Sequence, residues 1–175
     1  KYNLTITKLI YNTFKPLLTK DDLNILIYNT YYDNKLDMFI WIINNYNYNL
    51  HSIKIENDFF TNKNPIDIFW YSCMENNIDY SKIIYSNYIK YNQNVNIFKN
   101  QNHRIYFNNL LEHNNCDIDL LKWLFLISNF NIEYKQYLID LIEYLCEINN
   151  IEFLKWIIQN VAKLYKYDKI ILSEY

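Results

Sequence analysis

Three segments of the chain share one pattern of apolar and polar positions. They begin at Leu36, Ile118 and Ile151, and each reads aliphatic, acidic, two apolar residues, one variable residue, tryptophan and two more apolar residues. A weaker copy without tryptophan begins at Ile78, so successive copies start 42, 40 and 33 residues apart. Self-similarity at such a period is the sequence signature of a repeat architecture, and we therefore predict a repeat protein.

Each copy predicts an amphipathic helix, because its apolar residues recur at intervals of three and four. A further helical stretch precedes each copy, and we expect these first helices at residues 23–32, 65–75, 106–112 and 137–147. The helices thus come in pairs, with longer polar connections between the pairs. The turns within the pairs are expected at Asp33-Asn34, Asn76-Asn77, Asn114-Asn115 and Asn149-Asn150.

Such short turns need a residue with positive φ, which is usually glycine. The chain contains no glycine. Asparagine is the next most tolerant residue, so we infer that it replaces glycine here. We expect valine or isoleucine at Asn149 or Asn150 to destabilise the fold. Two helix starts are also predicted, a near capping box formed by Thr19 and Asp22 and a start at Asn64-Pro65.

These patterns predict an all-α fold, a solenoid of stacked helix pairs in a single domain spanning residues 1–175. The repeats are expected at about residues 19–46, 64–91, 102–128 and 134–165, with partial or capping repeats at 1–18 and 166–175. The tryptophans occupy the same position in three copies, so we expect them to pack between repeats rather than to bind a ligand. They are Trp41, Trp123 and Trp156.

Composition limits the possible partners. Hydrophobic residues make up 51% of the chain, which argues against disorder, and the formal net charge is only −2. This charge gives no strong attraction to phosphate backbones or anionic membranes, so nucleic acid is an unlikely partner. No apolar run is long enough to span a membrane. Because the chain begins with Lys1, we expect it to be a processed product or part of a longer protein.

The three cysteines are too few and too dispersed for a disulfide scaffold, which favours a reducing compartment. We therefore expect an intracellular, cytoplasmic location. His113 and Cys116, with His103 nearby, are the best candidate metal ligands, but structural zinc needs four clustered ligands. An ordinary buried cysteine and a packed or solvated histidine explain them better, and we predict no metal site.

No catalytic constellation is recognisable. A Cys–His nucleophile has no sequence support, and Glu143 with Glu147 fits a solvated helix face better than paired catalytic carboxylates. A glycine-rich phosphate loop is impossible without glycine. We therefore predict no enzyme activity and no cofactor. The loop from Tyr88 to Arg104 mixes Lys90, Lys99 and Arg104 with aromatic residues, which leaves a nucleic-acid-binding helical repeat as a minor alternative.

The residues around the last turn resemble the ankyrin repeat. Residues 144–156, Tyr-Leu-Cys-Glu-Ile-Asn-Asn-Ile-Glu-Phe-Leu-Lys-Trp, are similar to that family's helix–turn–helix junction, and the final spacing of 33 equals its period. Asn64-Pro65-Ile66-Asp67 resembles its Thr-Pro-Leu-His helix start, and its small buried residue maps onto Cys73 and Cys146. The turn glycines are missing, and spacings of 40 and 42 require insertions in the loops.

The resemblance implies a non-enzymatic module that binds another protein through projecting loops and the concave face of the first helices. The chain is rich in Asn, Ile, Lys and Tyr, and degenerate ankyrin arrays with this bias are similar to those encoded by AT-rich large DNA viruses and some amoebal genomes, which would place the protein in host cytoplasm or a virion. A structural subunit of a larger assembly is the alternative. Exposed aromatic residues in the loops are the expected contacts, namely Phe59, Phe60, Tyr91, Phe98, Phe130 and Tyr134.

Overall fold

The computed structural model describes residues 4–14, 17–50, 53–55, 66–91, 93, 95–112, 116–129 and 132–164. These residues are mostly helical, as the sequence predicted. They belong to two compact units, one made of residues 1–71 and 79–93 and the other of residues 72–78 and 94–175. We refer to them as unit 1 and unit 2.

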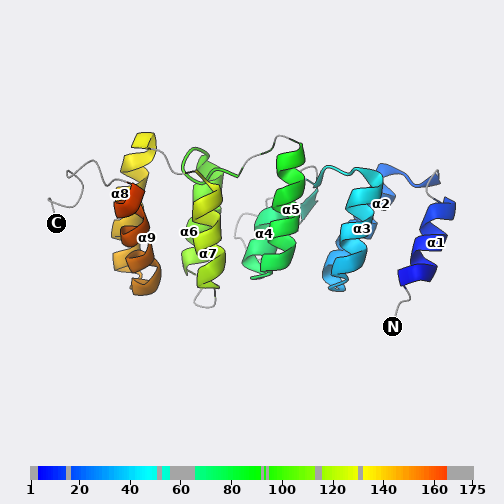
Figure 1. Ribbon diagram of the computed structural model, residues 1–175, viewed down its shortest axis with the longest axis horizontal. Coiled ribbons are helices and arrows are strands. Elements are labelled where there is room, and N and C mark those ends of the chain that lie inside the picture. The colour runs from blue at the N-terminus through cyan, green and yellow to red at the C-terminus, as the bar shows by residue number, and fades with distance from the viewer. Residues whose placement is uncertain are drawn as a thin grey trace. The chain divides into compact units, whose positions relative to one another are not determined.

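Figure 1 labels the helices along the chain. Two helices fall within each predicted repeat, and a two-residue antiparallel ladder and one 3₁₀ turn accompany them. The elements are α1 (Leu4–Phe14), α2 (Lys20–Tyr32), α3 (Leu36–Tyr46), β1 (Lys54–Ile55), β2 (Ile66–Asp67), α4 (Ile68–Met74), α5 (Ile78–Lys90), α6 (Gln101–Glu112), α7 (Ile118–Ile127), η3 (Ile132–Tyr134), α8 (Lys135–Glu147) and α9 (Ile151–Leu164).

In unit 1, α2 packs against α3, and β1 pairs with β2 so that Ile55 faces Ile66. An aromatic cluster fills the space between the helices. The Tyr31 ring lies 4.8 Å from the Tyr80 ring and 5.9 Å from the Tyr71 ring, and Phe39 lies 5.0 Å from Tyr80. Edge-to-face contacts of this kind add to the stabilisation from burial. Burial also raises the pKa of Tyr80 to about 12.

The segment after α3 is held to α5 by one buried amide. Asn87 donates a hydrogen bond from Nδ2 to the carbonyl of Tyr48 at 2.9 Å and accepts one from the backbone N–H of Leu50 at 3.0 Å. Leu50 is 0% exposed, so its N–H has no access to solvent and needs a partner within the protein. The Asn87 side chain therefore completes the backbone hydrogen bonding of a buried loop.

In unit 2, α9 packs against both α7 and α8. Its core is formed by phenylalanines from three helices. Phe153 of α9 lies 6.1 Å from Phe107 of α6 and 6.4 Å from Phe125 of α7, and all three side chains are almost completely buried. The long-range contacts of unit 2 therefore converge on Phe153.

Burial follows the sequence repeat. The seventh residue of every copy is 0% exposed, which applies to Ile42, Ile84, Leu124 and Ile157. The repeated tryptophans at the sixth position are each half-buried. Trp156 stacks on Phe153 at 5.7 Å and meets Phe125 edge to face at 5.7 Å, as expected for a packing residue. The three repeated tryptophans therefore lie at the margin of the core, whereas the fourth, Trp70, is 1% exposed.

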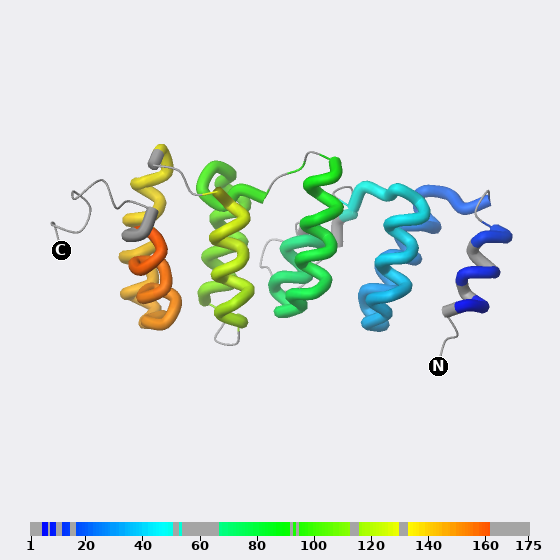
Figure 2. Tube along the Cα trace, viewed as in Figure 1, coloured from blue at the N-terminus to red at the C-terminus, as the bar shows by residue number. Residues whose placement is uncertain are grey.

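Asparagine does take the place of glycine in the turns. Asn34, Asn76 and Asn149 have φ of 52°, 56° and 57°, and the fourth predicted turn, Asn114-Asn115, lies outside the described residues. Each turn forms the two hydrogen bonds of a Schellman motif. At the turn that Figure 2 traces between α8 and α9, the N–H of Asn149 donates to Cys146 and that of Asn150 to Leu145.

We expect Asn149→Val to lower the free energy of unfolding by about 1 to 3 kcal/mol, because a β-branched residue is strained at positive φ. Thermal unfolding followed by circular dichroism measures the loss, and Asn149→Gly should be at least as stable as the wild type.

The prediction for Asn150 changes, since this residue is absent from the positive-φ positions. Its side chain accepts from the Phe153 N–H at 3.3 Å, so Asn150→Val removes only a cap, worth about 1 kcal/mol. If Asn149→Val were as stable as the wild type, the expected strain of a β-branched residue at the positive φ of position 149 would be contradicted.

The capping box at α2 is confirmed. Thr19 Oγ1 accepts from the Asp22 N–H at 3.2 Å, and Asp22 accepts from the Thr19 N–H at 2.9 Å. The Asp22 carboxylate also accepts from the Thr19 hydroxyl at 2.6 Å, and this bond, with the one from the Thr19 N–H, lowers the pKa of Asp22. Asn64 and Pro65 lie outside the described residues, but the helix start predicted there is wrong, because Ile66 and Asp67 form strand β2 and α4 begins at Ile68, where Asp67 Oδ1 accepts from the Phe69 N–H at 2.9 Å. Helix α6 begins five residues before its predicted start, because Asn100 Oδ1 accepts from the N–H groups of Asn102 and His103.

Candidate binding surfaces

The loop aromatics do not form a common exposed surface in the described residues. Phe59, Phe60 and Phe130 lie outside those residues. Phe98 is 0% exposed and contacts Phe125 and Tyr137 at 5.1 and 5.6 Å, so it is a core residue. It is therefore not available to a partner.

The other two predicted contacts are half-buried. Tyr134 stacks on Phe98 at 6.0 Å, and the Tyr91 hydroxyl donates to the Asn47 carbonyl. Lys90 lies over the Tyr91 ring at 5.7 Å. Tyr91 thus contacts the end of α3 and Tyr134 contacts the segment before α6, and both keep part of their surface accessible.

The basic and aromatic residues of the loop from Tyr88 to Arg104 are divided between the two units. Lys90 and Tyr91 belong to unit 1, whereas Phe98 and Arg104 belong to unit 2. Arg104 donates from Nε to the Phe98 carbonyl at 3.0 Å and also from Nη2, and its guanidinium lies 4.5 Å from the centre of the Tyr137 ring. The guanidinium is therefore committed to contacts inside unit 2.

Cys116, considered above as a metal ligand and as a nucleophile, has a thiol that stays protonated. Cys116 is half-buried, and burial, with a smaller contribution from the Asp117 charge, raises the pKa of its thiol to about 12. A protonated thiol is a poor nucleophile and a poor metal ligand. His113 lies outside the described residues, and within them no group of three or more potential metal ligands comes together.

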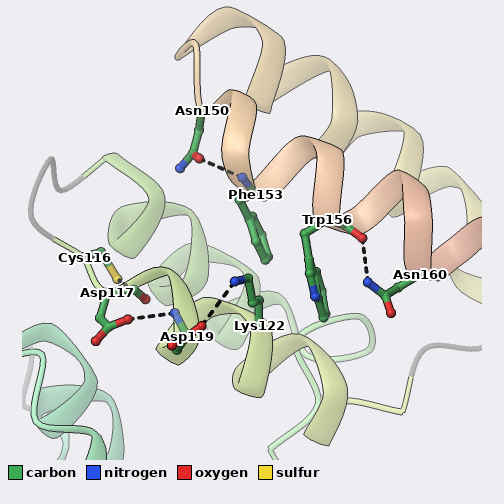
Figure 3. A network of polar contacts seen from close by, with 8 residues as sticks. All are labelled: Cys116, Asp117, Asp119, Lys122, Asn150, Phe153, Trp156 and Asn160. Atoms are coloured by element: carbon green, nitrogen blue, oxygen red, sulfur yellow. Dashed lines mark hydrogen bonds and ion pairs between the residues drawn. The ribbon is translucent and has the colours of Figure 1, made fainter.

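Figure 3 shows what surrounds Cys116. Asp117 caps α7 by accepting from the Asp119 N–H at 2.7 Å, and Lys122 pairs with Asp119 at 3.2 Å. A shallow hollow of about 390 Å³ lies beside Cys116, and its walls include Ile148, Ile151 and the polar residues Asn149, Asn150 and Glu152. Of the polar groups drawn there, Asp117 and Asn150 cap helices, and Asn160 donates to the Trp156 carbonyl within α9.

The two cysteines assigned to the small buried position differ. Cys73 is 0% exposed, but Cys146 is exposed, so packing does not explain Cys146. At the equivalent position of the first repeat, Tyr31 is covered by Tyr71 and Tyr80 of the next helix pair.

Sequence reasoning missed an exposed apolar stripe on α2, which we call the α2 stripe. Ile25, Tyr28 and Tyr32 are 57%, 37% and 56% exposed. The rings of Tyr28 and Tyr32 lie 4.6 Å apart, and the Tyr32 hydroxyl is 2.9 Å from that of Tyr71. Their spacing of three and four places them on one helix face, next to the face that carries the buried Ile27 and Tyr31. That periodicity was visible in the sequence.

The second missed feature is a groove between α6 and α8, which we call the α6–α8 groove. Its volume is about 350 Å³, and carboxylates dominate its polar lining. Tyr144 donates a hydrogen bond to Glu112 Oε1 at 2.5 Å, and Tyr137 donates to Asn108 Oδ1 at 3.2 Å. The lining residues are Asn108, Tyr137, Asp140, Leu141, Glu143, Tyr144 and Glu147.

Comparison with known proteins does not assign the chain to a family. No family model, curated protein or solved structure matches it. Among the described residues, no helix is long and apolar enough to cross a membrane. The candidate surfaces therefore have to be interpreted from their own chemistry.

Proposed function

We propose that the protein is a non-enzymatic interaction module that binds another protein through the outer face of its first helices. The observation that carries this proposal is the α2 stripe, because exposed tyrosines are frequent binding anchors. Tyrosine offers a large apolar ring with a polar tip and few rotatable bonds, so immobilising it costs little entropy. Tyr28 and Tyr32 present two such rings side by side.

The repeat pattern supports an ankyrin-like interpretation of this module. The seventh residue of each repeated segment is buried in the core. Three turns have asparagine at positive φ, where the ankyrin family has glycine. In that family the first helices and the projecting loops carry the binding surface, and α2, α6 and α8 correspond to first helices. Our proposal therefore moves the expected contacts from the loop aromatics to helix surfaces.

Affinity capture with the full chain as bait, read by mass spectrometry, tests the proposal. We expect Tyr28→Ala with Tyr32→Ala to reduce recovery of the specific partner by about tenfold, since loss of an anchor commonly costs more than 1 kcal/mol. Ile89→Ala is the matched control, because Ile89 is 50% exposed on the second helix α5 of the same unit. Equal recovery with both variants would refute the α2 stripe as the binding face.

A structural subunit of a larger assembly is the second candidate. It is favoured by α1, where Ile6, Leu9 and Phe14 are 56%, 68% and 51% exposed. An apolar helix surface of this kind is common at subunit contacts. The same capture experiment separates the two functions. An assembly would be recovered as a particle of fixed stoichiometry, whereas a reversibly bound partner would exchange with free partner in solution.

A further inference from the structure

The α2 stripe continues toward the start of its helix into an acidic residue. Along this face the chain carries, at spacings of four, three and four residues, the exposed side chains of Asp21, Ile25, Tyr28 and Tyr32. These spacings keep the four side chains on one side of α2. Alternation of three and four residues is also the pattern with which one helix packs lengthwise against another. The exposed face of α2 is therefore suited to pairing with a second helix.

The order of these spacings is the same in both directions along the helix. If two copies of α2 lie antiparallel about a two-fold axis, Ile25 of each copy lies opposite Tyr28 of the other, and Asp21 lies opposite Tyr32. An aliphatic side chain then meets an aromatic ring at the centre. At each end, a carboxylate that accepts hydrogen bonds meets a phenol that donates one. A parallel pair would instead place Asp21 opposite Asp21, where the two charges repel.

The two tyrosines are already arranged for this contact. The rings of Tyr28 and Tyr32 lie 4.6 Å apart, so their immobilisation costs little additional side-chain entropy. The hydroxyl of Tyr32 lies 2.9 Å from that of Tyr71, and either oxygen can be the donor. When Tyr71 donates, Tyr32 accepts, and its own hydrogen can be donated to another acceptor. Asp21 of a second copy supplies that acceptor.

We propose that the α2 stripe binds a second copy of the chain, with the two α2 helices packed antiparallel about a two-fold axis. This inference rests on the proposed binding function and names the partner of the same face. One helix face is much smaller than the roughly 20 residues a side of a standard stable interface. We therefore expect a reversible dimer with a dissociation constant on the order of 100 µM.

Charges on α2 disfavour a phosphate-bearing occupant. Asp21, Asp22 and Asp33 are exposed at the two ends of the helix and would repel a nucleic acid or an anionic membrane surface. In the antiparallel dimer, Asp33 of one copy comes near Asp22 of the other. This repulsion limits the affinity, and a substitution at position 33 can reverse it.

Sedimentation equilibrium of the full chain tests the dimer. Between about 10 µM and about 1 mM, the wild type should show a reversible monomer–dimer equilibrium. We expect Ile25→Glu to raise the dissociation constant at least about tenfold, because it places a charge against an aromatic ring at the centre of the contact. The matched control is Ile89→Glu, the same change at a 50% exposed residue of α5 in the same unit. It should change the dissociation constant less than about twofold.

Asp33→Lys tests the antiparallel arrangement. It replaces the repulsion between position 33 and Asp22 of the second copy by an attraction, and should lower the dissociation constant about three- to fivefold. In a parallel pair the same substitution would place two lysines opposite each other and would not tighten the dimer. Asp33 has φ of −76° and ψ of 2°, a conformation that lysine also adopts, and circular dichroism shows whether each variant is folded.

Three results would overturn the proposal. One is a wild-type chain that stays monomeric at about 1 mM. The second is equal dimerisation of Ile25→Glu and Ile89→Glu, which would place the contact elsewhere. The third is a dimer that Asp33→Lys does not tighten, which would exclude the antiparallel pairing of α2.

These outcomes are separable from those of the capture experiment. If the chain stays monomeric but capture of a different protein still depends on Tyr28 and Tyr32, the second copy is not the partner and the proposed function stands. If the chain dimerises through Ile25 while capture of other proteins is indifferent to both tyrosines, the α2 stripe serves self-association and the binding of a different protein through it is refuted.

Discussion

Replacing Phe153 with alanine is expected to lower the free energy of unfolding by about 3 to 5 kcal/mol. The side chain is 0% exposed, and its ring contacts Phe107, Phe125 and Trp156 from three helices at 6.1, 6.4 and 5.7 Å. Removing the ring forfeits its burial and leaves a cavity that the surrounding aromatic rings cannot fill without leaving their rotamers. Urea unfolding of the full chain, followed by circular dichroism, measures the change.

Two variants control for this result. Phe153→Leu retains much of the volume and should cost about 1 to 2 kcal/mol. Ile158→Ala truncates an apolar side chain of the same helix that is 38% exposed, and it should cost about 1 kcal/mol or less. If Phe153→Ala were no more destabilising than Ile158→Ala, the placement of Phe153 at the centre of unit 2 would be incorrect.

Local features of the fold were predictable because their causes lie within a few residues. The turn at Asn149 needs positive φ, and a sequence without glycine leaves asparagine as the residue best able to adopt it. The capping box at Thr19 requires only an acceptor and an acidic residue three positions later. The seventh position of each copy is buried because it continues the apolar face of the amphipathic helix.

Features that depend on the neighbouring helix pair were not predictable in the same way. Phe98 lies in a polar loop, and the sequence gives no sign that its ring packs against Phe125 and Tyr137. Cys146 is exposed although the same position is buried at Tyr31 and Cys73. Ile158 is likewise 38% exposed, whereas its counterparts Ile43 and Phe125 are buried and Tyr85 is half-buried.

The two candidate surfaces differ in how far they could be found in advance. The α2 stripe repeats at helical spacing in one segment, so a search for apolar residues on the polar face of each helix would have revealed Tyr28 and Tyr32. The α6–α8 groove could not be found that way. Its carboxylates on α8 become a groove only because Glu112 and Asn108 of α6 reach Tyr144 and Tyr137.

Asn87→Leu is expected to lower the free energy of unfolding by about 2 to 5 kcal/mol. The substitution preserves the side-chain size but removes both hydrogen bonds to the loop after α3, which leaves the Leu50 N–H and the Tyr48 carbonyl without that amide. An unsatisfied buried polar group costs about 1 to 3 kcal/mol, and two are created here. Thermal and urea unfolding give the overall loss, and amide hydrogen exchange at Leu50 reports the local effect.

Asn45→Leu is the matched control for this prediction. Asn45 also donates from Nδ2 to a backbone carbonyl, that of Trp41 at 2.8 Å, but it does so on the exposed surface of α3 in the same unit. Water can replace that hydrogen bond, so the cost should stay within about 0.5 kcal/mol. Asn87→Asp separates the two bonds, because it keeps the acceptor for Leu50 and removes the donor to Tyr48. If the Leu50 amide stayed as protected in Asn87→Leu as in Asn45→Leu, the loop would be held by its apolar contacts and not by Asn87.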